Sequence, residues 1–210
     1  MSGANRIKGA GRLTPAKTLR FNFDDKLLTA VEGDTLASAL IANGIHLTGR
    51  SFKYHRPRGM LSAGPEEPNA LMDVGRDAVR RTPNIRATVQ EVYDGMKARS
   101  QNRWPSLAFD VGGLNNLASP FFAAGFYYKT FMWPKAAWKK IYEPVIRAAA
   151  GLGVAPTEPD PDHYANHFAH CDVLVIGGGA TGLSAALAAA HAGAQVILCD
   201  EQPETGGAFR

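Results

Sequence analysis

Cysteine is almost missing from this chain of 210 residues, which contains only Cys171 and Cys199. Because cysteine thiolates are the usual ligands of iron–sulfur clusters, the cysteine-free residues 1–170 lead us to expect no iron–sulfur cluster. The two cysteines lie in or beside predicted strands, which is more typical of small buried side chains than of a disulfide or a metal site. This usage fits a reducing compartment, so we expect a cytoplasmic protein.

Long hydrophobic runs are also lacking, and no stretch approaches the length of apolar sequence needed to cross a bilayer. Residues 1–20 are polar and basic and contain no apolar segment of the kind that a secretory signal requires. The formal net charge of +4 is modest and accompanies no recognised nucleic-acid-binding motif. We therefore expect neither a membrane nor a nucleic acid as a partner.

A glycine-rich turn between a short apolar strand and an alanine-rich helix is the most informative feature that is present. Residues 173–176 are apolar and mostly β-branched, as expected for a strand buried on both faces of a parallel sheet. Gly177, Gly179 and Gly182 follow with the spacing G-x-G-x-x-G. In order, they allow a tight turn, the approach of a pyrophosphate and close helix–strand packing. Residues 183–192 then favour a helix whose N-terminus points at the phosphates.

An acidic residue follows the second predicted strand, residues 196–199. Asp200 stands 18 residues after Gly182, where a carboxylate accepts hydrogen bonds from a ribose 2′-hydroxyl and repels the 2′-phosphate of NADP. The residues alone therefore favour NAD or the ADP half of FAD. The pair Gly206 and Gly207 has two interpretations, an ordinary loop or a close approach of the backbone to the nucleotide.

The N-terminal part of the chain predicts strands around a helix. Residues 19–23 and 26–31 alternate apolar and polar side chains, with a hairpin turn between them. A helix is predicted over residues 36–41, and residues 43–44 end it. Residues 70–74 and 86–92 are weaker strand candidates. The fold class that we expect is α/β (α+β), a cysteine-free ferredoxin-like β-grasp domain followed by the first βαβ unit of an incomplete Rossmann-type domain.

A basic segment, residues 49–59, and the following residues 62–69 occupy the region where a plant-type ferredoxin carries its C-x₄-C-x₂-C ligands. Without cysteines, the segment predicts a scaffold or a contact surface. The alternative is a binding site, in which basic side chains hold a phosphate or a neighbour's carboxylates; the residues concerned are Arg50, Lys53, Arg56 and Arg58. We expect His55, between these basic residues, to be a packed or exposed histidine and not a catalytic base.

An aromatic segment, residues 119–142, is interrupted by prolines and is followed by a proline-rich acidic linker over residues 156–162. Its aromatic side chains predict packing between domains or against another subunit. Three histidines at positions 163, 167 and 170 match no standard zinc spacing. We expect four regions: a basic arm (1–17), the β-grasp domain (18–98), an aromatic and proline-rich connector (99–168) and the start of the Rossmann domain (169–210).

Four segments together resemble the N-terminal part of the alpha subunit of bacterial heterotetrameric sarcosine oxidases; they are residues 49–59, 62–70, 124–134 and 169–177. The resemblance implies a complex that demethylates sarcosine oxidatively to glycine, forms hydrogen peroxide and transfers the one-carbon unit to tetrahydrofolate. It also implies NAD in the Rossmann site, with FAD as the alternative occupant, and FMN and FAD elsewhere in the complex. The implied partners are beta, gamma and delta subunits, and sarcosine and tetrahydrofolate bind elsewhere in the assembly.

Carried over by motif, the cofactor-binding residues are Gly177, Gly178, Gly179, Ala180, Thr181, Gly182, Asp200, Glu201, Gln202, Gly206, Gly207 and Ala208. No catalytic or metal-ligating residue is assigned. We expect enzymatic activity only within a longer polypeptide in its complex, and none from these 210 residues alone. Two other interpretations stay open, a subunit of a flavin dehydrogenase for another secondary amine and a non-catalytic module that docks onto partner subunits.

Overall fold

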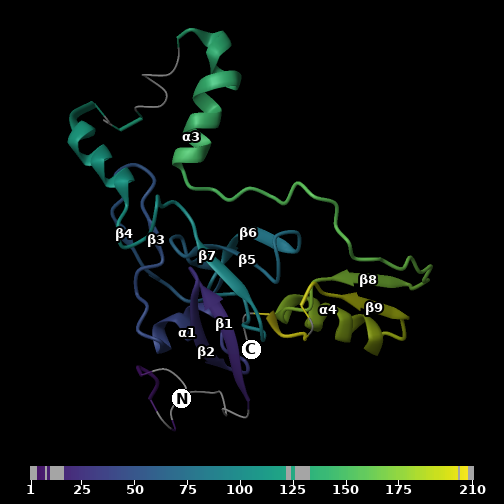
Figure 1. Ribbon diagram of the computed structural model, residues 1–210. Helices are drawn as coiled ribbons and strands as arrows, with labels where there is room; N and C mark the ends of the chain where they lie inside the picture. The colour runs from purple at the N-terminus through teal and green to yellow at the C-terminus, as the bar shows by residue number, and fades with distance from the viewer. Residues whose placement is uncertain are drawn as a thin grey trace. The chain divides into compact units, whose positions relative to one another are not determined.

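The computed structural model describes residues 4–7, 9, 17–121, 124–125, 133–202 and 204–207. The chain divides into two compact units, Met1–Asp160 and Pro161–Arg210. Both units combine helices with strands, so the prediction of a mixed α/β chain is confirmed (Figure 1).

A sheet of five strands forms the centre of the first unit, in the order β2-β1-β7-β5-β6. The strands are β1 (Thr18–Phe23), β2 (Lys26–Val31), β5 (Leu71–Gly75), β6 (Arg81–Arg86) and β7 (Lys97–Ser100). The pair β1–β7 is parallel, and the other three pairs are antiparallel. The sheet is therefore mixed, with the last strand in sequence at its centre (Figure 1).

The predicted hairpin and helix are confirmed. Asp24 and Asp25 form the turn between β1 and β2, both with positive φ angles, 45° and 65°. Asp and Asn tolerate this left-handed conformation better than other non-glycine residues, which explains their use here. Helix α1 (Leu36–Ala42) begins after Thr35, whose hydroxyl accepts a hydrogen bond from the backbone N–H of Ser38.

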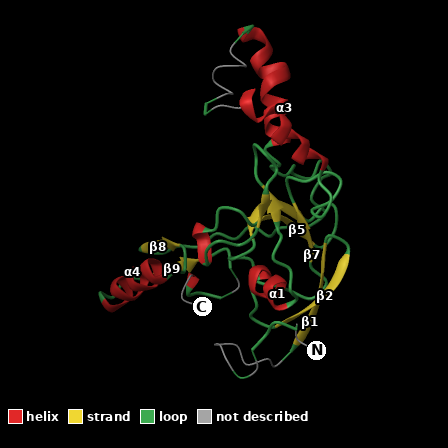
Figure 2. Cartoon of the chain, turned by 90° about the vertical axis from the view of Figure 1, so that its left-hand side faces the viewer, coloured by secondary structure: helices red, strands yellow, loops and turns green. Residues whose placement is uncertain are grey.

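One face of the sheet and helix α1 enclose the core of this unit (Figure 2). Alternate residues of β1, β5 and β7 point into it, as the period of two along a strand requires. The largest completely buried apolar side chains are Phe21, Leu36, Leu40, Met72 and Met96. The opposite face of β7 carries Lys97 and Arg99, both exposed.

The strand predicted at residues 70–74 is confirmed as β5, but the one predicted at residues 86–92 is wrong. Strand β6 ends where that segment begins, at Arg86. The following carbonyls of Ala87 and Gln90 accept hydrogen bonds from the first N–H groups of α1, those of Ala37 and Leu36. Because the first N–H groups of a helix have no partner within the helix, this segment satisfies them instead of continuing a strand.

Among the described residues, the remaining elements of the first unit are two strands of two residues each and five helical segments. They are β3 (Gly49–Arg50), β4 (Pro57–Arg58), η1 (Gly64–Glu66), η2 (Val111–Phe121), η3 (Lys135–Ala137), η4 (Trp138–Tyr142) and α3 (Glu143–Ala149). Much of the predicted aromatic packing lies outside the described residues or their side chains, including Phe122 and residues 126–131. Of the aromatic residues that are described, Trp133 is 83% exposed, and its packing against another domain or subunit stays a prediction.

The second unit contains one strand–helix–strand arrangement. Strands β8 (Val173–Ile176) and β9 (Val196–Cys199) are parallel and pair in register from Val173 with Val196 to Ile176 with Cys199. Helix α4 (Ala180–His191) connects them and begins three residues earlier than the predicted residue 183. The predicted strands and their parallel pairing are confirmed by this geometry. The expected burial of residues 173–176 on both faces is wrong, because Leu174 is 55% and Ile176 is 83% exposed.

Candidate functional site

The glycine turn joins β8 to α4 through a left-handed residue. Gly177 has a φ angle of 103°, and its N–H donates to the carbonyl of Cys199 at 2.8 Å. Gly179 then caps α4 without any side-chain hydrogen bond. No side chain of this capping residue competes for the N–H groups that the helix start exposes, which is the arrangement that favours an anion.

The glycines of the motif differ in the space around them. A Cβ atom at Gly182 would lie closer than 3.0 Å to the carbonyl oxygen of Gly177, so this glycine is required by helix–turn packing. A Cβ atom at Gly179 would meet nothing within 4 Å. The chain thus leaves open space at the one position where the motif needs the backbone to approach a pyrophosphate.

Asp200 lies against the glycine turn. Its Oδ2 accepts a hydrogen bond from the N–H of Gly178, and its Oδ1 accepts one from the N–H of Gln202 at 2.7 Å. The bond from Gly178, followed by that from Gln202, holds the pKa of the Asp200 carboxyl below its usual value. The carboxylate is therefore ionised at neutral pH, next to the space where a nucleotide would lie.

A third segment of the predicted site also reaches the turn. The N–H of Gly206 donates to the carbonyl of Gly178 at 2.8 Å, and a Cβ atom at Gly207 would lie 3.1 Å from the Cα of Gly179. Sequence reasoning missed Thr205, whose methyl group would lie 2.9 Å from a Cβ atom at Gly178. No local signal points to Thr205, because its contact depends on how this loop returns to the turn.

The remaining site residues surround this centre less closely. Ala180 and Thr181 form the first turn of α4, whereas Glu201 is exposed beyond Asp200. Ala208 lies outside the described residues. The structure thus brings the glycine turn, Asp200 and the loop at 205–207 together, and the binding roles of these residues stay predictions.

A second cluster of charged groups lies in the basic segment of the first unit. Nδ1 of His55 lies 2.6 Å from Oδ2 of Asp110, and the two side chains are only 10% and 1% exposed. Asp110 also accepts hydrogen bonds from the N–H groups of Trp104 at 2.9 Å and Gly112 at 3.2 Å. His55 is therefore packed, as predicted, and its contact with Asp110 joins the basic segment to residues 104–112.

Arg50 joins the same cluster from strand β3. Its guanidinium donates to the carbonyl oxygens of Leu107 and His55. Its Nε lies 3.9 Å from Oδ2 of Asp110. Arg50 is thus engaged with its own chain, whereas the side chain of Arg58 lies on the exposed strand β4.

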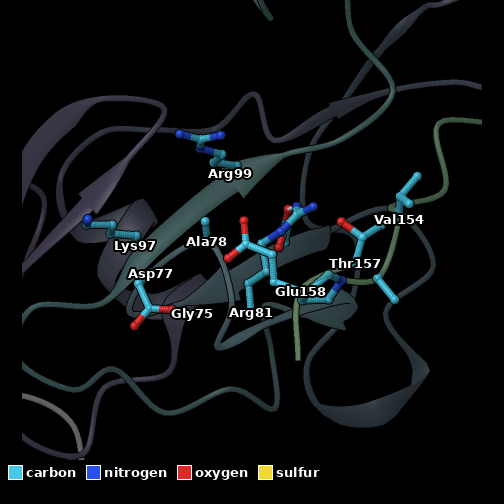
Figure 3. A pocket seen from close by; sticks show the side chains of 12 residues that line it. Gly75, Asp77, Ala78, Arg81, Lys97, Arg99, Val154, Thr157 and Glu158 are labelled. Atoms are coloured by element: carbon cyan, nitrogen blue, oxygen red, sulfur yellow. Dashed lines mark hydrogen bonds and ion pairs between the residues drawn. The ribbon is translucent and has the colours of Figure 1, made fainter. Parts of the chain in front are cut away.

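A cavity of about 520 Å³ lies over the polar side of β5–β7, where the extended residues 154–158 cross (Figure 3). Arg81 forms an ion pair with Oδ2 of Asp73, while Oδ1 of Asp73 is buried without a hydrogen-bond partner among the described atoms. Lys97, Arg99 and Glu158 add further charges to the lining. Sequence reasoning missed this cavity, since its lining comes from segments far apart in the chain.

Within the described part of the chain, which includes the three histidines at 163, 167 and 170, no group of three or more His, Cys, Asp and Glu side chains is arranged to hold a metal ion. Cys171 and Cys199 are both free thiols.

Two protein families match separate parts of this chain. Residues 16–103 match the family described as "2Fe-2S iron-sulfur cluster binding domain", and residues 172–209 match "FAD dependent oxidoreductase". The class of protein to which these segments point is an oxidoreductase subunit.

The relatives found among curated proteins agree with this class. A "Sarcosine oxidase subunit alpha" of Rhizobium meliloti (strain 1021) is 66% identical over 97% of this chain and 21% of its own length. Those of Corynebacterium sp. strains U-96 and P-1 are 33% and 35% identical, over 100% and 96% of this chain and 17% and 16% of their own lengths. The chain is a homologue of sarcosine oxidase alpha subunits and spans between about a sixth and a fifth of the length of these relatives.

A solved structure, the L-proline dehydrogenase from P. horikoshii, matches 92% of this chain and 26% of its own, with 23% identity and a TM-score of 0.40. At this TM-score the likeness does not bear on function. Among the described residues, none of the helices combines the length and the apolar character that a membrane crossing requires.

The cofactor prediction is wrong in two respects. The match of residues 16–103 to an iron–sulfur domain family contradicts the expectation of no iron–sulfur cluster. The match of residues 172–209 to FAD-dependent oxidoreductases contradicts NAD as the expected occupant of the glycine turn. The sequence argument judged the cluster from its cysteine ligands alone, whereas the family match rests on the similarity of the whole segment. Residues 16–103 themselves contain no cysteine, so this segment does not fit the thiolate ligation of such clusters.

Proposed function

We propose that this chain is part of the alpha subunit of a sarcosine-oxidase-like complex. In that complex, sarcosine is demethylated oxidatively to glycine, oxygen is reduced to hydrogen peroxide and tetrahydrofolate receives the one-carbon unit. The support is the 66% identity to the rhizobial alpha subunit over nearly the whole chain. The proposed partners are beta, gamma and delta subunits, with sarcosine and tetrahydrofolate bound outside these 210 residues.

The domain organisation that we propose follows from the same likeness. Residues 18–98 would form a β-grasp domain, which agrees with a hairpin, a helix and a central strand parallel to β1. Residues 99–168 would connect it to residues 169–210, the first strand–helix–strand unit of a Rossmann-type domain. Residues 1–17 would be a basic arm, although most of them lie outside the described residues.

The glycine turn is proposed to bind the ADP part of FAD. The observation that carries this proposal is the contrast between Gly182, where a Cβ atom is sterically excluded, and Gly179, where the space is open. The N–H groups at the start of α4 would hold the pyrophosphate, and Asp200 would face the ribose. FAD itself supplies the electron acceptance, while the chain's residues bind and orient it. The loop at Gly206 and Gly207 would close over the nucleotide.

Replacement of Gly179 by valine tests this site in the assembled protein. Its backbone is in an extended conformation with φ −73° and ψ −175°, which valine adopts, so the variant should fold. The side chain would then occupy the space of the pyrophosphate, and we expect the loss of one equivalent of FAD per assembly. The measurement is flavin and nucleotide released by acid precipitation and separated by chromatography.

Gly113→Val is the matched control, because Gly113 also has open space around its Cβ position. It lies in η2, remote in sequence from the glycine turn, and should leave the FAD content unchanged. Full FAD retention by Gly179→Val would overturn the site. A nucleotide other than FAD, released by the parent and lost only from Gly179→Val, would overturn the choice of ligand.

The reaction is tested separately by turnover of the assembled complex on sarcosine, dimethylglycine and proline, with hydrogen peroxide as the readout. We expect sarcosine to give the highest kcat/KM. Preference for another secondary amine would replace the substrate while leaving the FAD site intact.

A further inference from the structure

The loop between β4 and β5 closes around one buried carboxylate, that of Glu67. This residue is 1% exposed, although its neighbours Glu66 and Pro68 are exposed. Oε2 of Glu67 accepts hydrogen bonds from the N–H groups of Leu61 and Ser62, both at 2.7 Å. Oε1 accepts a third from the N–H of Asn69, also at 2.7 Å. The loop therefore turns its backbone donors inward onto a single side chain.

Backbone N–H groups stabilise the negative charge of Glu67. Among the described residues, no lysine, arginine or histidine forms an ion pair with it. A buried carboxylate is unfavourable unless hydrogen bonds to its charged form compensate for the lost water. Here burial raises the pKa of Glu67, but backbone hydrogen bonds, led by those of Ser62, Asn69 and Leu61, outweigh it and the net pKa lies below the usual value.

The geometry of these donors is that of a backbone anion nest, in which successive N–H groups converge on one negative charge. The donors come from both ends of the loop, residues 61–62 and residue 69. One carboxylate therefore holds the two ends of the loop together.

We propose that the backbone of residues 61–69 is a binding site for one carboxylate-sized anion and that Glu67 is its built-in ligand. The loop holds its conformation through the negative charge of this side chain and not through its volume. When the side chain is shortened, a free monocarboxylate such as formate takes its place. The same nest then orders the loop around an exogenous ligand.

Hydrogen exchange of the peptide covering residues 60–70, measured by mass spectrometry on the purified protein, tests the dependence on charge. Glu67→Gln keeps the size of the side chain but removes its charge, and the NH2 group that replaces one carboxylate oxygen faces a backbone N–H group instead of accepting its hydrogen bond. We expect exchange at Leu61, Ser62 and Asn69 to become about ten- to a hundredfold faster, because hydrogen bonds to charged groups are lost. Glu66→Gln, the exposed neighbour, is the matched control and should exchange like the parent. Unchanged exchange in Glu67→Gln would overturn the proposal.

Chemical rescue tests the binding site. In Glu67→Ala, sodium formate should restore the protection of this peptide, whereas sodium chloride at equal ionic strength should not. Equal effects of formate and chloride would refute a specific site. If Glu67→Ala does not fold, the Glu67→Gln measurement decides alone, since that variant preserves the packing of the side chain.

Discussion

The N–H of Gly178 donates a hydrogen bond to the carboxylate of Asp200, which lies 22 residues further along the chain. This bond ties the end of β9 to the glycine turn after β8. The acidic residue therefore shapes the turn itself, in addition to facing the space proposed for a ribose.

Replacement of Asp200 by asparagine should weaken FAD binding by roughly tenfold, because the charge is lost and only one of the N–H groups of Gly178 and Gln202 keeps an acceptor oxygen. The measurement is the FAD content of the assembled protein after dialysis. Glu32→Gln, an exposed carboxylate in the first unit, is the control and should have no effect. Equal FAD retention by Asp200→Asn and the parent would contradict the role of Asp200.

The lowered pKa of Asp200 also determines the pH at which the turn should lose FAD. Since the folded-state pKa of Asp200 is lowered, its contribution is present above about pH 4, the usual Asp value, and is lost only as the pH falls through the lower folded pKa. FAD release on acidification should therefore begin below about pH 4 in the parent. In Asp200→Asn this acid-dependent step should be missing from the release profile.

Gly182→Ala should disturb the turn even when no ligand is bound. The new methyl group would lie closer than 3.0 Å to the carbonyl oxygen of Gly177, and overpacking of this kind costs about 1–3 kcal/mol. Limited proteolysis within residues 172–199 should become faster, because cleavage follows the open population. Gly113→Ala, which adds a methyl group in open space, should be cleaved like the parent.

Asp110→Asn should destabilise the first unit by about 1–3 kcal/mol, because it removes the charged partner of His55 and of two backbone N–H groups. Urea unfolding monitored by hydrogen exchange of residues 103–113 provides the measurement. Asp25→Asn, in the exposed hairpin turn, should stay within about 0.5 kcal/mol of the parent. A similar loss in both variants would argue against a special role for the buried pair.

The stability that Asp110 contributes through this pair should decrease at acidic pH. Burial raises the pKa of Asp110, but hydrogen bonds led by the N–H of Trp104 and by His55 bring it below the usual value. The stabilisation is therefore fully present above about pH 4 and decreases as the pH falls further. Asp110→Asn should lose this acid dependence.

Gly151→Ala tests how residues 151–154 are held. Gly151 has a φ angle of 69°, and an added Cβ atom would lie closer than 3.0 Å to Asn102. Gly95→Ala has the same kind of backbone, with a φ angle of 79°, but open space around the new atom. In both variants alanine must adopt the left-handed conformation, which costs about 1–2 kcal/mol. The additional loss of stability in Gly151→Ala therefore measures the clash with Asn102. Thermal unfolding of the two variants side by side gives this difference.

Local patterns explain which elements could be predicted. The hairpin at Asp24 and Asp25, the helix after Thr35 and the turn from Gly177 to Gly182 each depend on residues within a few positions of one another. Strand β7 could not be predicted in this way, because its four residues are placed by pairing with β1 and β5, far away in the chain. The segment after Arg86 has the composition of a strand but satisfies the start of α1 instead.

The sequence by itself determined the strand–turn–helix–strand order of residues 173–199 and the acidic residue that follows, since steric freedom at glycine and helix propensity act locally. Only the tertiary structure decided that Glu67 is a buried anion, that His55 meets Asp110 and that Asp200 bonds to Gly178. His55 and Gly178 reach their carboxylates across 55 and 22 residues, which local patterns do not connect. Glu67 is bonded within its own loop, but its carboxylate leaves water only because the folded loop turns three N–H groups onto it.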